Sequence, residues 1–190
     1  MEEYIYVHQT FEKENHFGKR ITDREFDGCV FKNCDFSNCD FSGTVFLDCE
    51  FSDCNMGMMT VIKTGFKGVK FKTCKVLGIQ FPDSDDFLFN VEFEDCILDY
   101  SSFSNKKMPK TKFMNSSLKE VTFTGTDLSG AVFQNVNLER AVFNDTQLKE
   151  ADFTTAYNYS IDPEFNPMKK AKFAMQGITG LLDKYDIKIQ

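Results

Sequence analysis

Large apolar side chains recur at every fifth residue over most of the chain. One series runs from Phe26 to Phe81, and a second runs from Leu88 to Phe153 after a shift of two residues. An α-helix repeats its faces about every 3.6 residues and a β-strand every two, so a strict period of five fits neither. The period instead predicts a repeat architecture.

A second series of side chains lies two residues before each large apolar position. It consists mostly of small or β-branched residues and contains every cysteine of the chain, whereas the three intervening positions are mostly polar. Each five-residue unit is therefore expected to turn two side chains inward and three outward. The cysteines of this series are Cys29, Cys34, Cys39, Cys49, Cys54, Cys74 and Cys96.

The units resemble a known sequence repeat. CDFSN at 34–38, CDFSG at 39–43, TDLSG at 126–130 and ADFTT at 151–155 are similar to the units of pentapeptide-repeat proteins, and the resemblance covers residues 21–156. Members of that family are solenoids in which four pentapeptides form one coil. The resemblance therefore implies an all-β fold, a right-handed quadrilateral parallel β-helix. About seven coils would make a rod of roughly 30 Å, at one strand spacing per coil.

A coil of four units stacks residues that are twenty positions apart, and the sequence suits this spacing. The second series then forms two phenylalanine columns on opposite walls and two aliphatic columns between them, which would fill a square bore at close-packed density. Likewise, Cys34, Cys54 and Cys74 are expected to form one column. The phenylalanine columns are Phe93, Phe113, Phe133, Phe153 and Phe103, Phe123, Phe143, and the aliphatic ones are Leu98, Leu118, Leu138 and Leu88, Met108, Leu128, Leu148.

The repeat divides the chain into a solenoid over residues 21–156 and two flanking segments. Residues 1–20 lie outside the period and are expected to cap the N-terminal mouth, while residues 157–190 are expected to cap the other end and dimerise. The period breaks at residues 82–87, where two extra residues are expected to bulge from the wall. An insertion at a Pro-Asp corner is well tolerated when it faces water. Phe87 is either an exposed contact in this bulge or folded back onto the wall.

Four apolar residues near the C-terminus have helical spacing. Ile178, Leu181, Leu182 and Tyr185 follow the i, i+3, i+4, i+7 pattern, which predicts a short amphipathic α-helix. Laid across the last coil, this helix would cover the core and present an apolar surface to a second copy about a two-fold axis. These residues are therefore the candidate dimerisation surface of a homodimer.

Charge concentrates in one part of the chain. The protein has 29 acidic and 22 basic side chains, a net charge of −7, and residues 76–105 carry seven carboxylates and no basic residue. An acidic surface repels nucleic acid and favours a protein partner. A band of five lysines, Lys63, Lys67, Lys70, Lys72 and Lys75, precedes this segment. The candidate partner-binding residues are Asp83, Asp85, Asp86, Phe87, Glu92, Glu94, Asp95 and Asp99.

Catalytic and metal-binding chemistry has little support in the sequence. The two histidines, His8 and His16, lie in the N-terminal segment outside any nucleophile or ligand motif, and no phosphate-binding glycine loop is present. The cysteines are mostly spaced by multiples of five and face inward, which favours small buried residues over metal ligands. We therefore expect no enzymatic activity, no cofactor and no metal.

The sequence also bears on the cellular compartment. No stretch approaches the ~20 apolar residues of a membrane span, and the start Met-Glu-Glu lacks the features of a signal peptide. The protein is expected to be cytoplasmic, without a membrane partner and with its cysteines reduced.

The tail extends the resemblance to one branch of the family. Residues 171–187 and the preceding Ile161–Pro163 are similar to the C-terminal dimerisation module of the quinolone-resistance (Qnr-like) and toxin-immunity proteins. That branch is understood as a mimic of duplex DNA that binds DNA gyrase or topoisomerase IV. The resemblance therefore implies a homodimer that protects a type II topoisomerase from quinolones or a peptide toxin, without direct contact with nucleic acid.

One alternative stays open. The outward positions do not make an uninterrupted acidic column, because Asp35 is followed twenty residues on by Asn55 and then by Lys75, and Glu50 is followed by Lys70. The alternative is a scaffold or interaction protein with no topoisomerase partner, which would use the acidic bulge or the lysine band on another protein.

Overall fold

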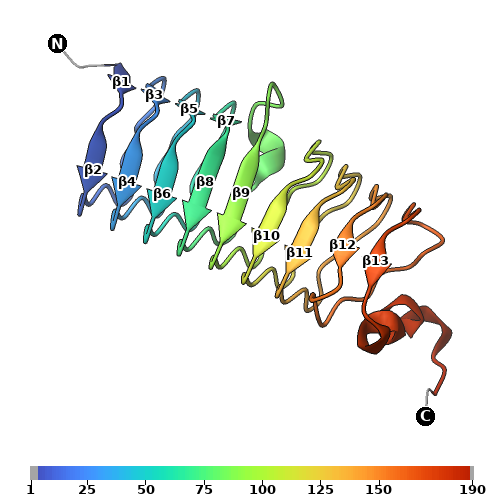
Figure 1. Ribbon diagram of the computed structural model, residues 1–190. Helices are drawn as coiled ribbons and strands as arrows, with labels where there is room; N and C mark the ends of the chain where they lie inside the picture. The colour runs from blue at the N-terminus through green and yellow to red at the C-terminus, as the bar shows by residue number, and fades with distance from the viewer. Residues whose placement is uncertain (1–3, 189–190) are drawn as a thin grey trace.

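The computed structural model describes residues 4–188 and shows a four-sided parallel β-solenoid (Figure 1). Each strand pairs in parallel with the equivalent strand of the next coil. Two walls form sheets, and the other two are held by ladders of single bridges such as Asp35↔Asn55↔Lys75. The four-stranded sheet consists of β1 (Ile5–Val7), β3 (Glu25–Asp27), β5 (Val45–Leu47) and β7 (Gly65–Lys67).

The second sheet runs the length of the rod. Its nine strands, at a spacing of ~4.8 Å, give a rod of roughly 40 Å, longer than expected. The strands are β2 (Thr10–Glu12), β4 (Val30–Lys32), β6 (Glu50–Ser52), β8 (Val69–Lys72), β9 (Val91–Glu94), β10 (Lys112–Met114), β11 (Val132–Gln134), β12 (Asp152–Phe153) and β13 (Lys172–Phe173).

The five-residue unit builds one side of the coil and one corner. In the unit at 34–38, Cys34 and Phe36 are buried, Asp35 bridges to the next coil, and its Oδ1 accepts a hydrogen bond from the Ser37 backbone N–H at 3.0 Å. Asn38 then turns the corner with a φ of 57°. Asparagine, aspartate and glycine tolerate this left-handed conformation best, which accounts for the polar residues of the repeat.

The core consists of stacked columns, as the spacing predicts. Phe93 and Phe113 stack with ring centroids 5.5 Å apart, and Phe103 and Phe123 stack at 5.6 Å on the opposite wall. Rings on different walls meet edge to face, as Phe113 and Phe123 do at 75°. Both geometries are favourable for aromatic pairs, so the bore is packed without distortion.

The smaller inward side chains form hydrogen-bonded ladders. The Cys54 thiol donates to the Phe31 carbonyl at 3.5 Å, and the Cys54 backbone N–H donates to the Cys74 sulfur at 3.4 Å. The column of Cys34, Cys54 and Cys74 is confirmed and continues to Cys96. All seven cysteines are free and buried, and burial raises the pKa of the Cys49 thiol to about 12.

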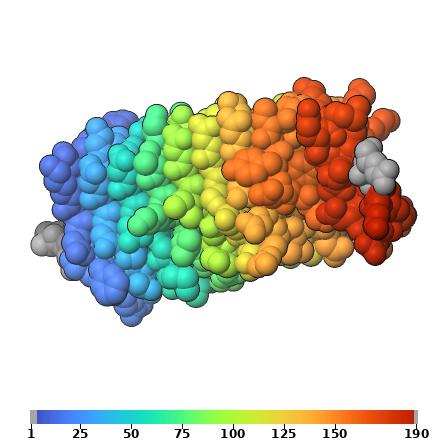
Figure 2. All heavy atoms as spheres, turned by 90° about the horizontal axis from the view of Figure 1, so that it is seen from below, coloured from blue at the N-terminus to red at the C-terminus, as the bar shows by residue number. Residues whose placement is uncertain are grey.

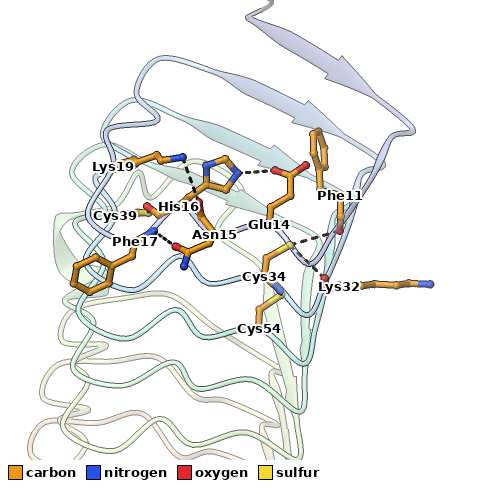
Figure 3. A network of polar contacts seen from close by, with 10 residues as sticks. All are labelled: Phe11, Glu14, Asn15, His16, Phe17, Lys19, Lys32, Cys34, Cys39 and Cys54. Carbon is orange, nitrogen blue, oxygen red and sulfur yellow. Dashed lines mark hydrogen bonds and ion pairs between the residues drawn. The ribbon is translucent and has the colours of Figure 1, made fainter.

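The solenoid begins earlier than the sequence period suggests. Strands β1 and β2 lie in register with the next coil, so residues 5–20 form a first coil rather than a separate segment. Its inward residues are Tyr6, Phe11 and His16, and Ile21 completes its fourth side. The His16 ring stacks on Phe36 with ring centroids 5.4 Å apart. The polar edge of His16 faces the mouth, where Nε2 lies 2.6 Å from Glu14 Oε2 (Figure 3). This coil therefore ends the core with amphipathic side chains.

The other end also extends further. Strand β13 pairs with β12, and Asn166 takes the place of a threonine in the inward column, with its Nδ2 donating to the Phe143 carbonyl at 3.2 Å. The chain then closes the end with two short 3-10 helices (Figure 1). In space-filling view the coils follow one another in sequence order along a continuous rod (Figure 2). No helix within residues 4–188 is long and apolar enough to cross a membrane.

Candidate protein-interaction surface

One loop interrupts the regular walls. Strands β8 and β9 pair with an offset of two extra residues, since Phe71 lies opposite Phe93. The chain leaves the wall after the Asp85 N–H bonds to the Thr64 carbonyl and returns where the Asn90 N–H bonds to the Phe66 carbonyl. Figure 1 shows this segment projecting beside β9, with the short helix η1 (Phe81–Asp83) at its start. We call residues 82–90, which comprise this excursion and the wall residues on either side of it, the insertion loop.

The tip of the insertion loop exposes two apolar side chains. Phe87 and Leu88 are each 65% exposed, and the Lys67 ammonium lies 5.0 Å from the centre of the Phe87 ring. The prediction that Leu88 resumes the inward series is wrong, because Leu88 turns outward with a φ of 58° and Phe89 fills the core. Of the two alternatives for Phe87, the structure shows the exposed one.

The candidate carboxylates surround one coil rather than following the rod. Asp83, Asp85 and Asp86 lie in the insertion loop, whereas Glu92 and Glu94 lie on β9 and the last two follow it around the next corner. Asp85 Oδ1 accepts from the Phe87 N–H at 3.0 Å, which orders the loop tip. The last two are Asp95 and Asp99, of which Asp99 accepts hydrogen bonds from the Ser117 hydroxyl and the Lys119 backbone N–H.

Neighbouring lysines neutralise the carboxylates on the nine-stranded sheet. Glu92 pairs with Lys112 at 3.2 Å, and Glu94 pairs with Lys72 at 3.4 Å. One outward column of the sheet alternates in sign from Glu50 through Lys70 and Glu92 to Lys112. An uninterrupted acidic track therefore does not run along this sheet, whereas Asp83 and Asp86 of the insertion loop are exposed.

The sequence interpretation missed a residue beneath the loop. Lys106 lies two residues before Met108, so the period places it in the inward series, and it is buried. Its Nζ lies 2.6 Å from Asp86 Oδ1 and donates to the Ser84 carbonyl at 2.8 Å. The spacing was a signal for this position, although lysine is rare in a core.

The C-terminal segment closes the last coil with η2 (Met175–Leu181) and η3 (Asp183–Tyr185). Both are 3-10 helices, so the predicted helical segment is present but is not an α-helix. The backbone N–H of Ile161 donates to the Gly180 carbonyl at 2.9 Å, which fixes the segment against the coil. Gly180 packs on the Tyr159 carbonyl so closely that a Cβ atom would collide with it. Leu181 packs against the core.

Lys184 ties this segment to the turn before it. Its Nζ lies 2.7 Å from Asp162 Oδ1 and 2.9 Å from Glu164 Oε2. Although desolvation opposes the charged form, these carboxylates raise the pKa of Lys184, and Lys184 in turn lowers the pKa of Asp162. Ile178 and Tyr185 remain 37% and 53% exposed, so part of the predicted dimerisation surface faces solvent.

Comparison with known proteins establishes the family. Residues 24–86 and 86–153 match a family model described as a pentapeptide repeat region. The chain belongs to the pentapeptide-repeat family. A comparison of this pentapeptide-repeat sequence with curated proteins finds no match.

Solved structures of the same fold match nearly the whole chain. One trypsin-treated form of QnrB1, a plasmid-mediated fluoroquinolone resistance protein, matches with a TM-score of 0.65 and 17% identity, covering 98% of this chain and all of that one. Full-length QnrB1 matches with a TM-score of 0.54 and 17% identity over 96% of this chain. At this identity the likeness shows the fold.

Two surface hollows of this pentapeptide-repeat protein lie at the ends of the rod. A hollow of about 430 Å³ separates the last coil from η2 and includes Tyr159, and one of about 340 Å³ opens at the N-terminal mouth around His16. Within residues 4–188 no group of three or more His, Cys, Asp or Glu side chains is arranged to hold a metal ion. The feature with the clearest chemical character is therefore the insertion loop.

Proposed function

We propose that this protein binds a type II topoisomerase, DNA gyrase or topoisomerase IV, and protects it from quinolones or a peptide toxin. The observation that carries the proposal is the insertion loop, which exposes Phe87 and Leu88 between carboxylates on an otherwise regular rod. The full-length likeness to a fluoroquinolone resistance protein supports it. The protein acts by binding and needs no catalytic group.

The chemistry of the loop suits a basic partner. Large apolar side chains at the centre of a contact supply most of its binding energy, and surrounding charges set orientation and association rate. Enzymes that bind DNA carry basic grooves for its phosphates, so the carboxylates of Asp83 and Asp85 would be attracted there. Because the charges on β9 are paired with lysines, the loop rather than a continuous acidic track is the proposed contact.

A supercoiling assay tests this function. Purified gyrase is inhibited with ciprofloxacin, and the protein is titrated into the reaction. We expect wild type to restore supercoiling and Phe87→Ala/Leu88→Ala to lose about tenfold or more in potency. The matched control is Met58→Ala/Ile62→Ala, an exposed apolar pair on another coil, which should behave as wild type. No effect of the wild-type protein on gyrase or topoisomerase IV at micromolar concentration would overturn the proposal.

We also propose that a second copy of the chain covers the C-terminal segment. Met175, Ile178, Tyr185 and Ile187 leave apolar surface exposed there, whereas Leu181 and Leu182 are partly buried. Light scattering after gel filtration should give a dimer for wild type and a monomer for Met175→Asp/Ile178→Asp. Ile62→Asp, at an exposed apolar site far from this segment, should stay dimeric. A dimer that survives the double substitution refutes this interface.

One observation favours a second candidate function. The alternating charges from Glu50 to Lys112 leave the long sheet without the uniform charge of DNA. The alternative is an interaction protein that uses the insertion loop on a partner other than a topoisomerase. If neither the wild type nor any variant protects gyrase, this alternative function is favoured.

A further inference from the structure

Lys106 occupies a position that holds a threonine in the two following coils. The bridges from Lys107 to Asp127 and from Asp127 to Gln147 align Lys106 with Thr126 and Thr146. Each of these threonines is buried and donates its hydroxyl to a carbonyl of the preceding coil, as Thr126 does to Phe103 at 2.8 Å. Lys106 is only 1% exposed, but it does not make the equivalent bond.

All contacts of the Lys106 ammonium lead to the insertion loop. Its Nζ donates to the Ser84 carbonyl at 2.8 Å, lies 2.6 Å from Asp86 Oδ1, and lies 4.8 Å from the centre of the Phe89 ring. The Ser84 hydroxyl bonds instead to the Phe81 carbonyl, the group that a threonine at position 106 would satisfy. In the inward threonine column, Ser84 and Lys106 therefore both depart from the regular pattern, in two successive coils, to accommodate the loop.

The energetics make this lysine unlike a surface residue. Removing an ammonium from water is destabilising unless charged and polar partners replace its hydration. Here the counter-charge comes from Asp86, whose side chain is 81% exposed while its Oδ1 turns back to the core. The ion pair thus connects the packed bore with the outer surface of the loop, and moving the loop would leave the charge of Lys106 without its partner.

We propose that Lys106 is a positioning residue that anchors the insertion loop from inside the rod and so holds Phe87 and Leu88 in their exposed arrangement. The consequence for a topoisomerase rests on the proposed function, but the anchoring does not. A preordered loop loses less conformational entropy on binding, so the anchor would raise affinity without contacting the partner.

Limited proteolysis tests the anchor without any partner. Chymotrypsin cleaves after Phe87 or Leu88 only when the loop opens, and mass spectrometry identifies the fragments. We expect Lys106→Met, which keeps an unbranched side chain one atom shorter but has no donor, and Asp86→Asn to raise the cleavage rate about tenfold. The matched controls are Lys107→Met, an exposed neighbour, and Asp83→Asn, which removes the same charge elsewhere in the loop. Both should cleave at the wild-type rate.

The two variants also give a coupling test. If Lys106 and Asp86 act through one ion pair, the double variant should cleave about as fast as Lys106→Met alone, because the second change removes nothing further. Wild-type cleavage rates in Asp86→Asn, a surface change that leaves the rod folded, would overturn the anchor even if Lys106→Met fails to fold. A third outcome separates the two proposals. If Lys106→Met and Asp86→Asn are cleaved faster but neither the wild type nor any variant affects gyrase, the anchor is supported and only the topoisomerase proposal is removed.

Discussion

At the scale of single residues, the inward cysteines and threonines perform the same task. Thr64 donates its hydroxyl to the Phe41 carbonyl at 2.8 Å, and Cys49 donates its thiol to the Phe26 carbonyl at 3.2 Å. Each side chain satisfies a backbone carbonyl that points along the bore, and buried carbonyls without partners are costly. The thiols are therefore structural, and their properties follow from burial.

Burial of Cys49 predicts a pH dependence of stability. The pKa of this thiol is about 12 in the folded protein against an ordinary value of 9.0. Above pH 9 the unfolded chain therefore releases a proton that the folded chain keeps, so stability is present below pH 9 and falls as pH rises toward 12. Between pH 8 and pH 10 wild type should lose about 1 kcal/mol more than Cys49→Val in urea unfolding.

Cys49→Val is the matched control because Val69 occupies the same column in the next coil. The comparison cancels the titration of tyrosines and lysines, which both proteins share. Identical loss of stability in the two proteins between pH 8 and pH 10 would contradict the assignment of Cys49 as a protonated buried thiol.

At the scale of the element, the corners of the coil hold many residues with positive φ. Lys110 turns one corner with a φ of 61°, and Gly130 turns the same corner one coil later with a φ of 68°. Non-glycine residues in this conformation carry a strain of about 1 kcal/mol. Polar side chains at the corners thus keep the surface hydrophilic, but the backbone strain at these positions lowers the free energy of unfolding.

Glycine at such a corner should stabilise the rod. We expect Lys110→Gly to raise the free energy of unfolding by roughly 0.5 kcal/mol, since relief of strain exceeds the added freedom of the unfolded chain. Lys107→Gly, in the extended segment bridged to Asp127, should lower it by roughly 1 kcal/mol. Urea unfolding measures both, and a loss of stability in Lys110→Gly would show that strain at the corner is negligible.

The period predicts these elements because every regular unit repeats the same local chemistry. It misses the first coil because Tyr6 and His16 place polar groups at inward positions, which the terminal coil requires where its core meets water. It also cannot choose between Leu88 and Phe89, since both are apolar neighbours and the choice depends on how the insertion loop returns to the wall.

At the scale of the whole molecule, each coil packs mainly on the two beside it, so a local insertion leaves the rest of the rod in register. The wall continues unchanged through Phe113 and Phe133 after the insertion loop. Lys106 is the compensating change. The period places it in the inward series, but its partners Ser84 and Asp86 are defined only by the fold. The regular solenoid and the insertion loop are therefore structurally independent.

This separability allows the loop to be removed while the rod is kept. Deleting Asp86 and Phe87 and substituting Phe89→Ser gives the unit SDLSN, in which Ser84 and Leu88 fall on the inward positions of the repeat. Lys106→Thr then restores the threonine column of Thr126. The resulting protein should keep the β-sheet circular dichroism signal and melt no lower than wild type, because it lacks both the buried charge and the exposed Phe87.

The same variant should lose protection of gyrase by about tenfold or more in the supercoiling assay, since Phe87 is absent and Leu88 turns inward. A second variant with only Lys110→Gly, which keeps the insertion loop, serves as the control for changes in rod stability and should protect as wild type does. Full protection by the loopless rod would place the contact on another surface of the solenoid, and an unfolded product would show that the insertion is part of the fold.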